Sequence, residues 1–126
     1  MKILGREELR NQLIKGEIAP VYLLFGEETY LRDVAAKTIA DKSLTDSSLR
    51  EFNDTEFSLA DSKIEYALAA AEQLPMISAR RVVKITEVRV SATGAKDTLK
   101  EDDETLLARY LQRPAASSVV IFVAGT

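Results

Sequence analysis

Apolar residues form two kinds of pattern along the chain. Continuous apolar runs predict parallel strands at 21–25, 81–88 and 118–123, the first of them covered on both faces. Apolar residues spaced three or four apart predict helices at 7–15, 28–41 and 61–74, and a last helix from residue 101 to just before Pro114. The segment 49–53 is short and partly polar, which makes it an edge-strand candidate.

The apolar stripes of these helices predict which residues face a core. They are Leu31, Val34, Ala35, Thr38 and Ile39, then Ile64, Ala67, Leu68 and Ala71, then Leu107, Tyr110 and Leu111. Pro75 ends the third helix near Leu74, because its ring disfavours a helical conformation in the preceding residue. A surface loop is expected at 91–100.

Strands that alternate with helices favour right-handed βαβ crossovers. We therefore expect a three-layer α/β domain with a mostly parallel sheet and helices on both faces. Residues 1–126 have no repeat or low-complexity stretch and form a single domain in this interpretation. Because the strand at 118–123 is of a kind that normally continues into further structure, we expect the N-terminal part of a longer chain.

Composition removes many kinds of chemistry. The 126 residues include no Cys and no His, which excludes thiol nucleophiles, zinc–thiolate sites and histidine bases. A net charge of -3 argues against a surface wholly devoted to nucleic acid and favours a protein partner. Since no apolar run is long enough to span a bilayer, we expect a cytoplasmic protein without a membrane partner.

The first strand leads to the place where a P-loop would bind phosphate. Gly26 is present, but Glu27 and Glu28 follow it, and the Gly-Lys-Thr ending is missing. The strand that should supply a magnesium-holding acid offers only Glu87 and contains Lys84. We expect a P-loop-like domain with a degenerate nucleotide site, no cofactor and no metal. Glu27 and Glu28 also fit ordinary acids at a helix N-terminus.

A receiver-like phosphoacceptor domain has a similar length and sheet. That chemistry needs an acidic pair after the first strand and an Asp at the end of the third. Glu27 and Glu28 could imitate the pair, but no Asp ends a later apolar strand. The four acids at 101–104 do not converge on one ion, since consecutive helical residues point in different directions.

An apolar cluster at a loop rim is the most informative feature. The proline that stops the third helix leaves Leu74, Met76 and Ile77 between helix and strand, where polar residues are usual. Such a cluster can insert into a partner's pocket, or it can fold back over the sheet edge. The nearby basic residues Arg80, Arg81, Lys84 and Arg89 lack stacking aromatics, so a solvated strand start or an acidic protein surface is favoured over DNA.

Three motifs in register resemble the N-terminal domain of the delta subunit of the bacterial DNA polymerase III clamp loader. They are Pro20–Glu28 with Tyr30 and Leu31, Leu74–Ser78 with Arg80–Val83, and Tyr110, Leu111 and Pro114 with Val119–Phe122. The resemblance implies an AAA+-like fold that has lost its nucleotide site and is not itself an enzyme. It also implies that the protein takes part in DNA replication. A C-terminal part outside this sequence would contact the other clamp-loader subunits.

The resemblance further implies that the rim segment binds the sliding clamp, the beta subunit, and helps open the ring. The family's clamp-binding element corresponds to Leu74, Pro75, Met76 and Ile77, with no catalytic residue. Met-Ile replaces the frequent apolar–aromatic pair, and Lys84 in an internal strand is a second departure. A nucleotide-dependent P-loop enzyme, a receiver-like module and a scaffold without a clamp partner remain alternatives.

Overall fold

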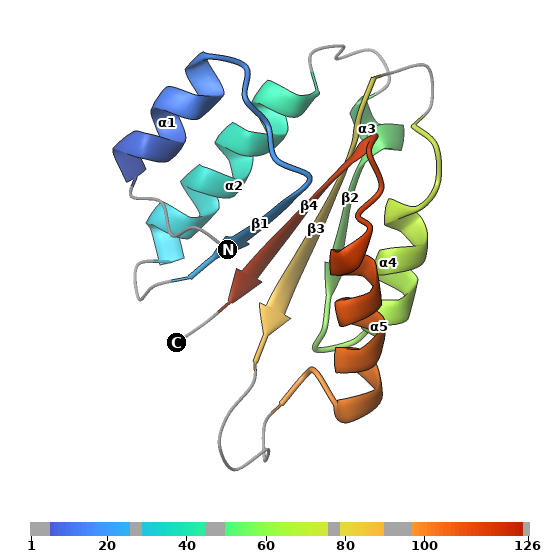
Figure 1. Ribbon diagram of the computed structural model, residues 1–126. Coiled ribbons are helices and arrows are strands. Elements are labelled where there is room, and N and C mark those ends of the chain that lie inside the picture. The colour runs from blue at the N-terminus through green and yellow to red at the C-terminus, as the bar shows by residue number, and fades with distance from the viewer. Residues whose placement is uncertain (1–5, 26–28, 45–49, 76–78, 90–96, 125–126) are drawn as a thin grey trace.

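A computed structural model describes residues 6–25, 29–44, 50–75, 79–89 and 97–124. These ranges form helices and strands that alternate except where α3 follows α2 (Figure 1). In chain order they are α1 (Arg6–Ile14), β1 (Val21–Leu24), α2 (Thr29–Ser43), α3 (Arg50–Asn53), β2 (Asp54–Ser58), α4 (Ile64–Ala71), β3 (Arg81–Val88), α5 (Glu101–Gln112) and β4 (Ser118–Ala124).

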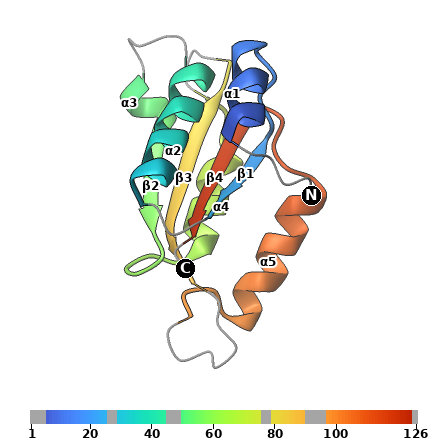
Figure 2. The same ribbon diagram turned by 90° about the vertical axis from the view of Figure 1, so that its left-hand side faces the viewer.

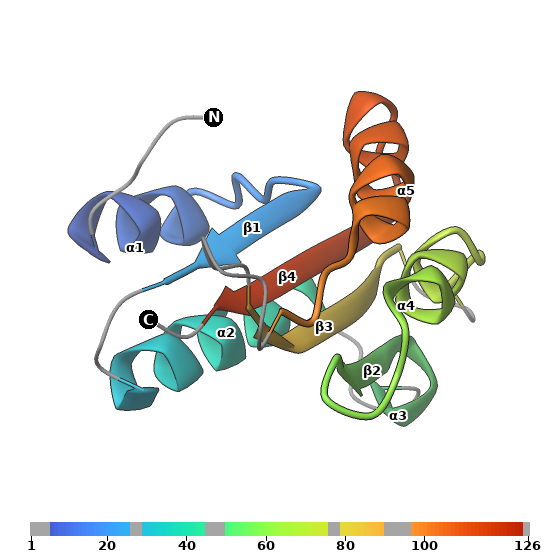
Figure 3. The ribbon, with the colours of Figure 1, turned by 90° about the horizontal axis from the view of Figure 1, so that it is seen from below.

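The four described strands form one parallel sheet with the order β1-β4-β3-β2. Helices α1 and α2 cover one face, and α4 and α5 cover the other (Figures 1 and 2). Figure 3 shows β1 at one edge of the sheet and β2 at the opposite edge. The predicted three-layer α/β fold is confirmed.

A separate apolar core lies on each face of the sheet. On the face of α1 and α2, Leu13 and Ile39 pack with Val119 and Ile121 of β4. On the face of α4 and α5, Ile64 and Tyr110 pack with residues of β3 and β4. Six of the seven residues of β4 are buried, which explains its continuous apolar sequence.

Local sequence signals account for two helix ends. Gly16 has φ +78°, and its N–H donates to the carbonyl of Leu13 at 3.1 Å, so a residue without Cβ closes α1. At the start of α5, the Lys100 N–H donates to Asp103 Oδ2 at 3.0 Å. That carboxylate belongs to an acidic first turn, which the helix dipole favours.

The strand predicted at 49–53 is wrong in position, although its edge placement fits the strand that follows. Residues 50–53 form the short helix α3, and edge strand β2 begins only at Asp54. Arg50 supplies a physical reason, because its guanidinium pairs with Asp41 at 2.7 Å and with Asp54 at 3.5 Å. These contacts join α3 to α2 and to the start of β2.

The predicted buried stripe of α2 is also wrong in part. Leu31 and Val34 are 39% and 43% exposed, whereas Ala36, Ile39, Ala40 and Ser43 are buried. The helix therefore turns its small residues toward β3 and β4, which allows a close approach to the sheet. Similarly, Leu111 of α5 is 42% exposed, so Tyr110 is the buried anchor of that stripe.

Strand β1 lies at a sheet edge and is not covered on both faces. Leu23 is 41% exposed, whereas Tyr22 is buried against the α1 and α2 core. Apolar composition predicted the strand, but strand order decided its exposure.

Candidate functional site

The predicted apolar rim lies where α4 meets the amino end of β3. Helix α4 ends at Ala71, three residues earlier than predicted, and Leu74 follows in the connection. Leu74 is 83% exposed, the highest value among the large hydrophobic side chains of the described residues. Pro75 is half-buried. Leu74 thus does not fold back over the sheet edge, while Met76 and Ile77 lie outside the described residues.

Hydrogen bonds hold the chain between Ala71 and Leu74 in a defined turn. The Glu72 N–H donates to the Leu68 carbonyl at 3.1 Å, and the Gln73 N–H donates to the Ala70 carbonyl at 3.2 Å. The second bond spans three residues rather than four, so the helix tightens as it ends. Ser118 Oγ, at the start of β4, donates to the Ala71 carbonyl.

The predicted basic stretch is not a single patch. The side chains of Arg81 and Arg89 sit at opposite ends of β3, and Lys84 lies between them. Arg81 donates to the carbonyls of α4 and α3, Lys84 Nζ lies 3.4 Å from Glu56 Oε1, and Arg89 pairs with Glu87. Arg80, the fourth member, is half-buried. Arg81, Lys84 and Arg89 are therefore engaged within the domain.

The two apolar cores show which face of the sheet each side chain of β3 occupies. Val82, two residues before Lys84, belongs to the core under α1 and α2, so Lys84 points to that same face. Val83 and Ile85 face the α4 and α5 core. Lys84 avoids an unpaired buried charge because it reaches the carboxylate on edge strand β2.

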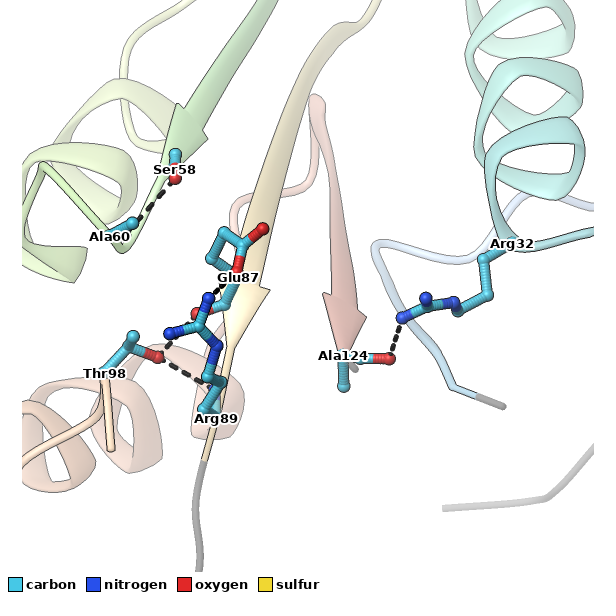
Figure 4. Close-up of polar contacts among 7 residues, drawn as sticks. All are labelled: Arg32, Ser58, Ala60, Glu87, Arg89, Thr98 and Ala124. Carbon is cyan, nitrogen blue, oxygen red and sulfur yellow. Dashed lines mark hydrogen bonds and ion pairs between the residues drawn. The ribbon is translucent and has the colours of Figure 1, made fainter. Parts of the chain in front are cut away.

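A polar cleft of about 410 Å³ lies at the carboxyl edge of the sheet, opposite the rim. Its charged lining residues are Arg32, Asp33, Glu56, Lys84, Glu87 and Arg89. Cations and carboxylates are balanced in this set. Arg32 donates to the Ala124 carbonyl and so links α2 to the end of β4 (Figure 4). It also donates to Thr29 Oγ1 at 2.9 Å.

Glu87, the residue at the position of a magnesium-holding acid, has an unusual backbone. Its φ is +58°, in the left-handed region, beside an irregularity in the pairing of β3 with β4. Thr98 stabilises this bend, since its Oγ1 donates to the Glu87 carbonyl at 2.6 Å and accepts the Arg89 N–H at 2.8 Å (Figure 4). The Glu87 carboxylate itself pairs with Arg89.

The sequence predicts the phosphate-binding part of a degenerate nucleotide site in the turn after β1. Gly26, Glu27 and Glu28 lie outside the described residues. Within the described ranges, no group of three or more acidic residues is arranged to hold a metal ion.

Sequence patterns did not reveal two features around the rim. One is the set of side-chain contacts from Arg81 and Ser118 to the end of α4. The other is a groove between α4 and α5, lined by Leu68, Leu106 and Tyr110 and flanked by charged residues. Burial raises the pKa of the Tyr110 hydroxyl, and the nearby Glu72 carboxylate adds to that effect. The sequence signals for this region were Pro75 and the apolar residues around it.

Solved structures share this architecture. A P-loop NTPase domain of a sigma-54 transport activator from E. coli superimposes with a TM-score of 0.58 at 12% identity, over 93% of this chain and 84% of that one. A DNA polymerase III gamma subunit-related protein from Thermotoga maritima gives 0.63 at 12% identity, over 93% and 38%. The fold is therefore that of the P-loop NTPase and AAA+ class.

Sequence similarity identifies the family within that class. The model of the family "DNA polymerase III, delta subunit" matches residues 22–125. DNA polymerase III subunit delta of Bacillus subtilis is 35% identical over 115 residues. The structure of the Bacillus subtilis DNA clamp loader delta protein gives a TM-score of 0.82 at 30% identity. This chain belongs to the DNA polymerase III delta subunit family.

The similarity covers most of this chain but a limited part of its relatives. It spans 90% of the chain and 33% of the Bacillus subtilis subunit, and 94% and 34% in the structural match. Among the described helices, none has the length and apolar character needed to cross a membrane.

Proposed function

We propose that this domain binds the ring-shaped sliding clamp of the replication machinery through Leu74, Pro75, Met76 and Ile77. In this proposal it acts in a clamp loader during DNA replication and helps to open one interface of the ring. Family membership supports the role in DNA replication. The 83% exposure of Leu74, just after the end of α4, supports this segment as the binding surface. A large apolar side chain left in water on a fixed turn is the observation that carries the proposal.

The energy available from this segment fits a reversible contact. Burial of three large apolar side chains in a partner gives at most roughly 5 to 9 kcal/mol before ordering costs. Micromolar affinity is compatible with that range, and tighter binding needs contacts beyond the apolar segment. A reversible contact suits a loader, which must release the clamp after opening it.

The same proposal makes the domain a binding module rather than an enzyme. ATP would be bound and hydrolysed by other loader subunits, which contact the remainder of the delta chain. Two of the cations that line the carboxyl-edge cleft already have carboxylate partners, Lys84 with Glu56 and Arg89 with Glu87. A triphosphate would have to compete with those carboxylates for the cations.

Introducing two negative charges tests the clamp-binding segment. The double variant Met76→Asp, Ile77→Asp of the full-length protein should lose detectable binding to its purified sliding clamp, because two carboxylates would enter an apolar pocket. Its thermal unfolding should match the wild type. Ile14→Asp is the matched control, since Ile14 is 65% exposed on α1 and should leave clamp binding unchanged.

Two outcomes contradict the proposal. Unfolding of the double variant would mean that Met76 and Ile77 belong to the core. Clamp binding at wild-type strength by a folded double variant would mean that the contact lies elsewhere.

A further inference from the structure

The last carbonyl groups of α4 accept hydrogen bonds from side chains that belong to the sheet. A helix leaves its final carbonyls without partners in its own backbone, and water usually satisfies them. Here Arg81 Nη1, at the start of β3, donates to the Ala70 carbonyl at 3.3 Å, in addition to the bond from the Gln73 N–H. Ser118 Oγ, at the start of β4, donates to the Ala71 carbonyl. The end of α4 is thereby tied to the two central strands.

Arg81 makes further contacts that reach beyond the helix. Its Nη1 also donates to Gln73 Oε1 at 3.3 Å, and its Nη2 donates to the Phe52 carbonyl in α3 at 3.4 Å. The Arg81 N–H donates to the Ser117 carbonyl at 2.8 Å, which fixes the root of the side chain. One guanidinium thus joins α3, α4 and the turn that immediately precedes Leu74.

The chemistry of this position is specific to arginine. A planar guanidinium can donate to several acceptors in fixed directions, whereas a lysine ammonium behaves as a flexible point charge. A cation near the C-terminus of a helix also interacts favourably with the helix dipole. Arg81 Nε is buried and has no acceptor among the described residues, so the side chain is held by its terminal nitrogens.

We propose that Arg81 is a positioning residue that fixes the turn at residues 72–73 and so presents Leu74 to the sliding clamp. This inference rests on the proposed clamp-binding function. Arg81 itself does not touch the clamp in this account. It raises the fraction of molecules whose Leu74 already stands in the binding arrangement, and apparent affinity follows that fraction. The backbone from Gln73 to Leu74 transmits the effect.

Substitution of Arg81 by methionine tests the inference, because methionine keeps much of the side-chain length and removes every donor. We expect Arg81→Met in the full-length protein to bind the sliding clamp about tenfold more weakly, as for a turn held correctly about a tenth of the time. Backbone amide exchange should become faster at Glu72 and Gln73. Arg89→Met is the matched control from the other end of β3, and its clamp affinity should equal that of the wild type.

A double-mutant cycle with Leu74→Ala separates positioning from general stability. If Arg81 acts through Leu74, then Arg81→Met should change the clamp affinity of the Leu74→Ala protein by only about twofold or less. A full tenfold effect in that background, or no effect in the wild-type background, overturns the inference. Wild-type affinity of Leu74→Ala alone would instead remove Leu74 from the proposed clamp contact, so the two failures are distinguishable.

A milder variant keeps the test decisive if Arg81→Met does not fold. Gln73→Met removes one acceptor on an exposed side chain and leaves the contacts of Arg81 to Ala70 and Phe52. We expect about a threefold loss of clamp affinity with unchanged thermal unfolding, again as a shift in the presenting fraction. Unchanged affinity together with unchanged amide exchange at residues 72 and 73 would contradict the positioning role.

Discussion

Leu74→Ala is the substitution for which the structure gives the clearest magnitude. Complete burial of a leucine side chain is worth about 1.5 to 3 kcal/mol. Because Leu74 is 83% exposed in the free domain, most of that energy is still available to a partner. We therefore expect Leu74→Ala to weaken clamp binding by about 2 kcal/mol, or about 30-fold in dissociation constant.

The same substitution should hardly change the stability of the free protein. An exposed side chain contributes little to folding, so the unfolding free energy should change by less than about 0.5 kcal/mol. Leu68→Ala is the comparison on α4, the helix that precedes Leu74, because Leu68 is 6% exposed and belongs to the core. That variant should lose about 2 to 5 kcal/mol of unfolding free energy.

Two measurements on the full-length protein check these numbers. Isothermal titration against the purified clamp gives the dissociation constants, and urea denaturation gives the unfolding free energies. Ile14→Ala serves as the binding control, since Ile14 is exposed on α1 and is far along the chain from the rim. Wild-type affinity in Leu74→Ala, or a loss of stability as large as that of Leu68→Ala, would refute the reasoning.

Two further predictions concern the rest of the domain. Calorimetric titration with ATP and magnesium should give no heat beyond dilution, because the cations Lys84 and Arg89 already have carboxylate partners; saturable heat would indicate a working nucleotide site. Burial raises the pKa of Tyr110 above its value in the unfolded chain. The stability that the neutral Tyr110 hydroxyl contributes is therefore fully present below about pH 10, and it is lost as the pH rises further. Tyr110→Phe should flatten the fall in unfolding free energy above pH 10, and an unchanged slope would mean that another group titrates there.

Long, strongly patterned segments were predictable from sequence. The bounds of β3 were predicted correctly at 81–88, and α4 buries the four residues that its spacing indicated. The short element at 50–53 was not predictable, because ion pairs from Arg50 to Asp41 and Asp54 stabilise it, and Asp41 belongs to a different helix, α2. The buried face of α2 was misplaced because apolar spacing shows where leucine and valine stand, not how closely alanines allow a helix to approach a sheet.

The candidate site was predictable to a similar extent. Pro75 and the apolar residues around it marked the rim, and the structure places Leu74 in solvent. The position of Met76 and Ile77 stays a prediction, as does the loss of phosphate binding at Gly26, Glu27 and Glu28. Family membership confirmed the resemblance, which rested on several short motifs in one order.

By itself, the order of residues determined most of the segments that become helices or strands, the proline that keeps α4 from continuing past Leu74, and the reactive side chains that the domain lacks. Those properties depend on local backbone preferences and composition. Tertiary structure alone decided that β1 lies at an edge, that Lys84 reaches Glu56, and that Arg81 ties the end of α4 to the sheet. Each of these depends on contacts between segments distant in sequence, which exist only after the crossovers have set the order of the strands.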